Sequence, residues 1–262
     1  MITWQAVEDA GYGVPEGHDL DDLVAGLSRA LADSDPEVRD GAAYSVLATW
    51  IARGVIDAPR RRALGDEMAA RFADPRIQAR TFAPLVLDML VEAGEFSPAW
   101  VDAFAHWYVA EEDLRGHDDT LGWLHAVAHG ADLLAAFGLR PEVDPVRMLG
   151  LGAARLLAPT PYVFDQQEDD RLALALAQVL NRPGLTGEQA TGWLPPLEEG
   201  IRSMGRGPAP VCASNTMRTL RQLYYLADQG VRPHPGADRV PMRHGPVLRQ
   251  ALAAVLDLVD CR

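Results

Sequence analysis

The residue types best suited to chemistry lie in one short stretch, GWLHAVAHGADLL, at positions 122–134. His125 and His129 are four residues apart, and Asp132 follows three residues later. On an α-helix, side chains three and four residues apart lie on the same face. Two imidazoles at this spacing are typical of helical zinc sites, and a nearby carboxylate can be a third ligand or fix the tautomer of one imidazole. The spacing therefore predicts a candidate site for a divalent metal such as zinc.

The helix predicted around these residues is otherwise apolar or small. At 3.6 residues per turn, His125, His129 and Asp132 fall in a wedge about 80° wide, bordered by Gly122 and Ala136. A helix that is apolar nearly all round is a buried helix. Two simpler interpretations stay open: the wedge is a narrow solvent-facing side, or its polar groups form a satisfied hydrogen-bond network in the core.

The stretch departs from the zinc-protease motif, in which a glutamate directly after the first histidine acts as general base. Ala126 occupies that position here, so a base would have to come from elsewhere. The candidates are polar residues just upstream and on a later predicted helix: Glu111, Glu112, Asp113, His117, Asp118, Glu168, Asp169 and Asp170. A metal-dependent hydrolase or lyase is therefore an alternative function.

The elements that must position these residues are predicted to be helices. A capping residue followed by proline recurs, because the cap accepts a hydrogen bond from a helix N–H and proline at the first helical position has no N–H to leave unbonded. These pairs are Asp35-Pro36, Asp74-Pro75, Ser97-Pro98 and Asp144-Pro145. Two further helix starts have the spacing of capping boxes: Asp165 with Glu168, and Thr186 with Gln189.

Apolar residues between these starts recur at helical spacing, and no segment alternates as a strand would. The predicted helices span 19–32, 36–53, 59–73, 75–93, 98–111, 119–137, 145–158, 166–181, 187–204, 214–229 and 246–260. The second helices of successive pairs start about 40 to 48 residues apart, close to the period of HEAT and armadillo repeats. We therefore expect an all-α fold, a curved array of HEAT/armadillo-like hairpins with about five pairs plus a C-terminal helix, in a single domain over residues 1–262. An irregular helical bundle is the alternative.

Charge and hydropathy exclude several classes of partner. The chain has a formal net charge of −13, and all 24 of its basic residues are arginine. Nucleic acid and anionic membrane surfaces attract positively charged proteins, so we expect neither as a partner. No stretch reaches the roughly 18 apolar residues that span a bilayer, and the first residues do not resemble a signal peptide. With only two cysteines, we expect a cytoplasmic protein with reduced thiols.

Two blocks of the sequence resemble a known family. EDLRG…GWLHAVAHGADLL, at 112–134, resembles the signature of a bacterial family catalogued as domain of unknown function 2785. EDDRLALAL, at 168–176, resembles a second block of that family. The resemblance implies no particular activity, because the family is one of unknown function. The resemblance implies that Trp123, His125, His129 and Asp132 belong to a family motif.

The leading functional hypothesis is a cytoplasmic binding protein with a central polar pocket for a small molecule or a protein partner. Its predicted binding residues are Trp123, His125, His129 and Asp132, joined by Arg171 from the neighbouring predicted helix. The alternative is the metal-dependent hydrolase or lyase, with His125, His129 and Asp132 as metal ligands. Because no residue of the motif fixes a reaction, the sequence leaves open whether the protein is an enzyme.

Overall fold

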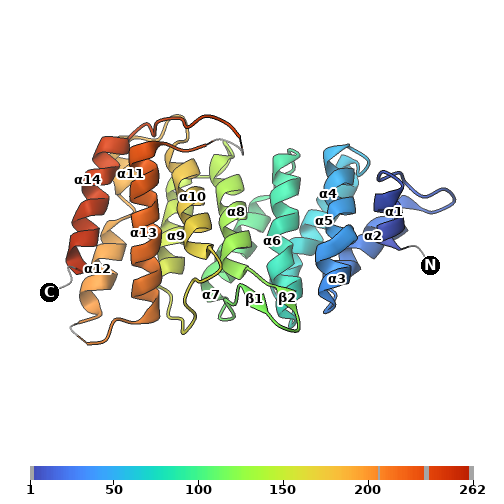
Figure 1. The fold of residues 1–262 in the computed structure, drawn as a ribbon. Coiled ribbons are helices and arrows are strands. Elements are labelled where there is room, and N and C mark those ends of the chain that lie inside the picture. The colour runs from blue at the N-terminus through green and yellow to red at the C-terminus, as the bar shows by residue number, and fades with distance from the viewer. Residues whose placement is uncertain (1–2, 206, 233–235, 260–262) are drawn as a thin grey trace. The chain divides into compact units, whose positions relative to one another are not determined.

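The computed structural model describes residues 3–205, 207–232 and 236–259. Within these ranges the chain is mostly helical, which confirms the prediction of an all-α fold (Figure 1). The strands among the described residues are a single short antiparallel pair, β1 (His117–Asp118) and β2 (Gly122–Trp123), apart from an isolated bridge between Val231 and Val240. None of the described helices is both long and apolar enough to cross a membrane.

The chain forms two compact units. The first comprises residues 1–107 and 115–133, and the second comprises residues 108–114 and 134–262. The chain passes between the units three times: within helix α7 (Pro98–Ala110), between Leu114 and Arg115, and within helix α8 (Ala126–Leu139). The remaining helices of the first unit are α1 (Trp4–Asp9), α2 (Leu20–Ala30), α3 (Pro36–Val38), the π-helical turn η1 (Arg39–Ala43), α4 (Tyr44–Ala52), α5 (Ala58–Arg71) and α6 (Ile77–Glu92). Those of the second are α9 (Pro145–Leu157), α10 (Glu168–Leu180), α11 (Gly187–Thr191), α12 (Pro195–Ser203), α13 (Val211–Gln229), α14 (Gly245–Leu256) and the 3₁₀ turn η2 (Asp257–Val259).

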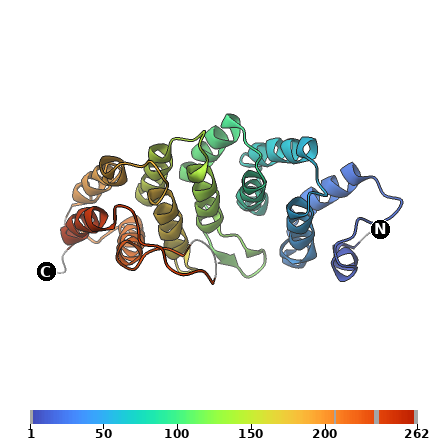
Figure 2. The same ribbon diagram turned by 90° about the horizontal axis from the view of Figure 1, so that it is seen from above.

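Helices within each unit bury apolar faces against their neighbours. In the first unit, α5 packs against α6, and α4 packs against α2 and α6 (Figure 2). In the second, α13 packs against α9, α10 and α14. Fully buried side chains in these contacts include Leu27, Leu47, Trp50 and Leu87 of the first unit and Leu172, Leu176, Leu220 and Leu252 of the second. Burial of this apolar surface is the main source of stability, at about 25 cal/mol per Å².

The helix starts follow most of the predicted caps. The side chains of Asp35 and Asp144 accept hydrogen bonds from the first turns of α3 and α9, and α7 begins at Pro98. Thr186 and Gln189 form the predicted capping box of α11. The helix predicted over 187–204 is split, because the proline pair at 195–196 starts a new helix, α12.

Two other predicted helix starts are wrong. Helix α6 begins at Ile77, because the Asp74 carboxylate accepts from the Arg76 N–H and guanidinium instead of capping a helix at Pro75. The box between Asp165 and Glu168 does not form. Gln167 adopts a left-handed conformation before α10, and Glu168 accepts from the Gln166 N–H, so this carboxylate closes a turn.

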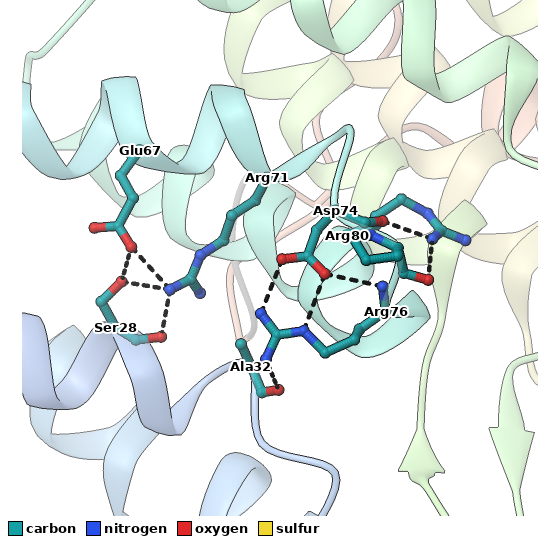
Figure 3. Close-up of polar contacts among 8 residues, drawn as sticks. Ser28, Ala32, Glu67, Arg71, Asp74, Arg76 and Arg80 are labelled. Carbon is teal, nitrogen blue, oxygen red and sulfur yellow. Dashed lines mark hydrogen bonds and ion pairs between the residues drawn. The ribbon is translucent and has the colours of Figure 1, made fainter.

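Polar contacts of arginine side chains link helices α2, α5 and α6 of the first unit (Figure 3). Arg71 at the end of α5 donates to the carbonyl and the hydroxyl of Ser28 on α2, both at 2.7 Å. Arg76 donates to Asp74 and to the carbonyl of Ala32, and Arg80 donates to the Asp74 carbonyl. Arginine side chains thereby bond the carbonyl groups at helix ends, which would otherwise lack partners.

Candidate functional site

The segment before α8 is a β-hairpin, so the prediction of a helix over 119–137 is wrong in its first part. His117 pairs with Trp123 and Asp118 pairs with Gly122 across the hairpin. The Asp118 carboxylate accepts from the N–H groups of Thr120 and Leu121, each at 2.9 Å, which closes the loop. These hydrogen bonds lower the pKa of the Asp118 carboxyl. A side chain that binds nearby backbone N–H groups in this way competes with helix formation.

His125 lies at the junction between the hairpin and α8. Its φ is +53°, in the left-handed region, so it is not part of the helix. Its carbonyl accepts from the His129 N–H at 2.9 Å, which makes His125 the residue from which α8 starts. Of the three polar residues in the predicted wedge, His129 and Asp132 therefore lie on the helix and His125 does not. The prediction that His125 and Gly122 share a helical face with them is wrong.

Arg39 fastens the hairpin to the helical turn η1. Its side chain is fully buried, with 0% exposed, and pairs with Asp40 at 2.7 Å. Its Nη2 donates to the carbonyl of Trp123 at 3.2 Å and to that of Leu121, and its Nη1 donates to the carbonyl of Asp33 at 3.0 Å. A buried arginine that bonds several carbonyls holds two segments in one register.

The hairpin also lies in direct contact with α3. Gly122 has a φ of +69°, and a Cβ atom placed there would lie 2.7 Å from the Cβ of Pro36. No residue other than glycine fits this position without movement, because both the backbone conformation and the close contact exclude a side chain. Arg39 and Gly122 together fix where Trp123 lies.

A pocket of about 250 Å³ opens beside the hairpin within the first unit. It is lined by Asp40 of η1, Tyr44 of α4, Phe82 and Leu85 of α6, Trp123 of β2, His125, and His129 of α8. The pocket is therefore built from six parts of the chain, and most of its walls are aromatic or imidazole rings. This volume lies just below the roughly 300–1,000 Å³ of pockets for drug-sized ligands, so it suits a smaller organic molecule.

Five rings follow one another along the hairpin and into the pocket. His117 contacts the edge of Trp123, with ring centroids 4.9 Å apart. His125 stacks on Trp123 at 4.7 Å with an angle of 6° between the planes. His125 then meets His129 at 5.4 Å, and His129 meets the edge of Phe82 at 5.6 Å. Trp123 nevertheless keeps 44% of its surface exposed, which leaves much of the indole accessible to a ligand.

The buried ring of His129 is held by the main chain of α6. Its Nδ1 lies 2.9 Å from the carbonyl of Thr81. A carbonyl only accepts, so Nδ1 carries a proton, and in the neutral ring Nε2 is the acceptor atom. Pro84 lies inside α6 and has no N–H to give to the preceding turn. Helix α6 nevertheless continues past Pro84 to Glu92, and the Thr81 carbonyl, about one turn before the proline, bonds His129.

The structure brings Trp123, His125 and His129 to one pocket but does not place the other predicted site residues in its lining. Asp132 is half-buried on α8, one turn after His129, and does not line the pocket. Arg171 is exposed on α10 of the second unit and does not line it either. Among the described residues, no group of three or more His, Cys, Asp or Glu side chains is placed to hold a metal ion. The metal site stays a prediction.

Five of the eight candidate general bases have structural partners of their own. His117 contacts Trp123, and Asp118 closes the hairpin loop and pairs with Arg115. In the second unit, Glu168 accepts from Gln166, and Asp169 pairs with Arg218 at 2.7 Å. The carboxylate of Glu111, also in that unit, accepts from the Asp113 N–H. The remaining candidates, Glu112, Asp113 and Asp170, belong to the second unit as well.

Sequence reasoning missed four residues of the pocket: Asp40, Tyr44, Phe82 and Leu85. The available signal was Gly41, a glycine inside a predicted helix. Gly41 has a non-helical ψ of −135°, and the turn around it is π-helical. Such interruptions of α-helices occur frequently at functional sites. Here the interruption separates Asp40 from Tyr44, both of which line the pocket.

Comparison with known proteins gives one match. The model of a family described as "Protein of unknown function (DUF2785)" matches residues 70–225, which is more than half of the chain. Neither the curated proteins nor the solved structures contain a match. The matched range includes Phe82, Trp123 and His129, whereas Asp40 and Tyr44 precede it. The chain belongs to the DUF2785 family of proteins of unknown function.

Proposed function

We propose that the protein binds a small organic molecule in the pocket between Trp123, His125 and His129. The observation that carries this proposal is the stack of Trp123 on His125, which lines a pocket of about 250 Å³ and leaves the indole 44% exposed. A large apolar side chain that stays accessible beside a pocket is typical of a ligand-binding position.

The rigidity of the walls supports the same function. Arg39 is buried beneath the hairpin and bonds the carbonyl of Trp123, and His129 is bonded to Thr81. Walls that are held before the ligand arrives lower the conformational entropy lost on binding. The proposed binding site thus has its shape before it meets a ligand.

The proposal also covers the arrangement of the helices around this site, the cell compartment and the class of partner. We place it in a HEAT/armadillo-like arrangement of helical hairpins, since α5 packs against α6 and the second helices predicted from the sequence recur at the period given above. We place the protein in the cytoplasm on its low cysteine content. Its partner would be a small molecule or a protein, because the net charge of −13 disfavours nucleic acid and membrane surfaces.

One observation favours a metal-dependent hydrolase or lyase as a second candidate. Histidines that ligate metals usually donate the other ring N–H to a carbonyl or a carboxylate. The contact between His129 Nδ1 and the Thr81 carbonyl has this form. His125 and His129 would be ligands, and Asp132 would be the third ligand or an acceptor near them.

A fragment screen tests the binding function. Small single-ring compounds, of which some are neutral, some cationic and some anionic, would be screened by ligand-observed NMR against the wild-type chain and Trp123→Ala. Tyr225→Ala is the matched control, because Tyr225 is an aromatic residue of the second unit that is 47% exposed. We expect fragments that bind the wild type and Tyr225→Ala but not Trp123→Ala. If no fragment distinguishes Trp123→Ala from the other two proteins, the pocket is not a binding site.

A further inference from the structure

We infer that the ligand of this pocket is a cation, an organic ammonium compound with an apolar body. The inference rests on the proposed function and adds the chemical class of the ligand. It follows from the charges, the hydrogen-bond donors and the aromatic faces of the walls.

The pocket has little to offer an anion. Of the described residues that line it, none is an arginine or a lysine, and the single residue of fixed charge is Asp40. Arg39 lies on the same turn, η1, as Asp40, but its side chain is fully buried. Its donors are directed to the carbonyls of Asp33, Leu121 and Trp123 and to the Asp40 carboxylate. Arg39 therefore positions the hairpin and is not available to bind a phosphate or carboxylate ligand.

The walls offer aromatic faces, which attract cations. Trp123, Tyr44 and Phe82 line the pocket, and tryptophan provides the strongest such face. Phe82 already takes part in one contact of this kind, since the Arg39 guanidinium lies 4.8 Å from the centroid of its ring. The exposed indole of Trp123 is the corresponding surface for a ligand.

The polar groups of the walls favour the same charge. The Asp40 side chain is 23% exposed, and a carboxylate has more lone pairs than its two bonds to Arg39 occupy. Nδ1 of His129 bonds the Thr81 carbonyl and therefore offers no donor to an anion. Because the Arg39 charge offsets part of the Asp40 charge, we expect selectivity for a cation of about tenfold, and not a very tight complex.

Three probes of similar shape and different charge test this inference. Choline is the cation, dimethylbutanol is the uncharged isostere with carbon in place of nitrogen, and dimethylbutyrate is the anion. Each would be titrated into the full chain at constant ionic strength by isothermal titration calorimetry. We expect choline to bind about tenfold more tightly than dimethylbutanol, and dimethylbutyrate to bind more weakly than either.

Variants locate the charge preference. Trp123→Leu should abolish the difference between choline and dimethylbutanol, and Asp40→Asn should reduce it several-fold. Asp238→Asn removes the same charge from an exposed loop of the second unit and should change nothing. Circular dichroism checks that each variant is folded, and the probe series on the wild type needs no variant at all.

The outcomes separate the two proposals. If dimethylbutanol or dimethylbutyrate binds as tightly as choline, or if choline does not bind while Trp123-dependent fragments do, the cation inference is wrong and the pocket remains a binding site. If no fragment depends on Trp123, the proposed function itself is wrong.

Discussion

The guanidinium of Arg39 donates to the main-chain carbonyl of Trp123 at 3.2 Å, although the two residues are far apart in the sequence. Arg39 lies in a π-helical turn and Trp123 lies in a β-hairpin. Neither element is stable as an isolated peptide, since a two-stranded hairpin is at best marginal in water. The buried arginine therefore joins two irregular elements into one wall of the pocket.

Replacement of Arg39 by methionine tests this role. Methionine fills similar space but leaves Asp40 and the carbonyls of Leu121 and Trp123 without their donor. Removal of one partner of a buried ion pair costs about 3–5 kcal/mol. We expect a loss of this size in the free energy of unfolding measured with urea, together with faster amide hydrogen exchange in the hairpin.

Arg202→Met is the matched control for Arg39→Met. Arg202 pairs with Glu198 on the surface of α12 and its side chain is 56% exposed. Such a pair contributes about 0–1 kcal/mol. Equal effects of the two substitutions would contradict the structural role of Arg39.

Replacement of Gly122 by alanine tests the contact between the hairpin and α3. The added Cβ would lie 2.7 Å from Pro36 and would have to adopt a φ of +69°. We expect a destabilisation of about 1–3 kcal/mol from the strained backbone and the displaced contact. The same variant should bind Trp123-dependent fragments more weakly, because the indole moves with the hairpin.

Gly150→Ala provides the control for Gly122→Ala. Gly150 lies inside α9, and a Cβ atom there would meet nothing within 4 Å. Alanine favours a helix over glycine by about 1 kcal/mol, so this variant should be as stable as the wild type or more stable. Chemical unfolding of both variants decides the matter: loss of stability in Gly150→Ala, or none in Gly122→Ala, would contradict the assigned contacts.

Local signals predicted most helices of this fold. The Asp35 and Asp144 caps and the Thr186 box were recognisable because both partners of each hydrogen bond lie within a few residues. The hairpin was missed because apolar spacing alone suggested a helix, whereas Asp118 bonds the loop and Gly122 takes a conformation that helices exclude.

The pocket could be predicted only in part. Trp123, His125 and His129 were named from one stretch, and the structure brings them together in the pocket lining. The lining from η1, α4 and α6 could not be read from that stretch, because it depends on the long-range bonds of Arg39 and on the contact of His129 with Thr81. Helical geometry groups Asp132 with the motif, but Asp132 lies outside the lining. Arg171 is predicted from a neighbouring helix, and that helix belongs to the second unit.

Acid should remove the contribution of Asp74 to stability. Hydrogen bonds from the Arg76 side chain are the main cause that lowers the pKa of Asp74 from 3.8 to about 2 (Figure 3). A carboxyl whose pKa is lower in the folded state stabilises the fold above the unfolded pKa, and this stabilisation is lost as pH falls through the folded pKa. The stability contributed by Asp74 is therefore present at neutral pH and disappears between pH 3.8 and about 2.

Asp74→Asn measures this contribution. We expect the variant to be less stable at neutral pH by up to about 1 kcal/mol, since the carboxylate is near the surface. The difference in unfolding free energy between the variant and the wild type should shrink as the pH falls from 3.8 to about 2. Urea unfolding at several pH values gives the result, and Asp238→Asn, in an exposed loop, should run parallel to the wild type. A difference that is unchanged in acid would contradict the pairing of Asp74 with Arg76.

Zinc analysis decides between the binding protein and the metal-dependent enzyme. Because His125 and His129 are the two imidazoles that meet in the described pocket lining, we expect two protein ligands at most, and therefore weak zinc binding in protein purified without chelators or an affinity tag. Any zinc added later should bind weakly through the imidazoles of His125 and His129. Stoichiometric zinc that His125→Ala and His129→Ala both lose, with helix content intact, would instead support the hydrolase or lyase. Asp132→Asn would then separate the roles of the carboxylate: a lost ligand abolishes zinc binding, whereas a lost orienting partner weakens it about 10–100-fold.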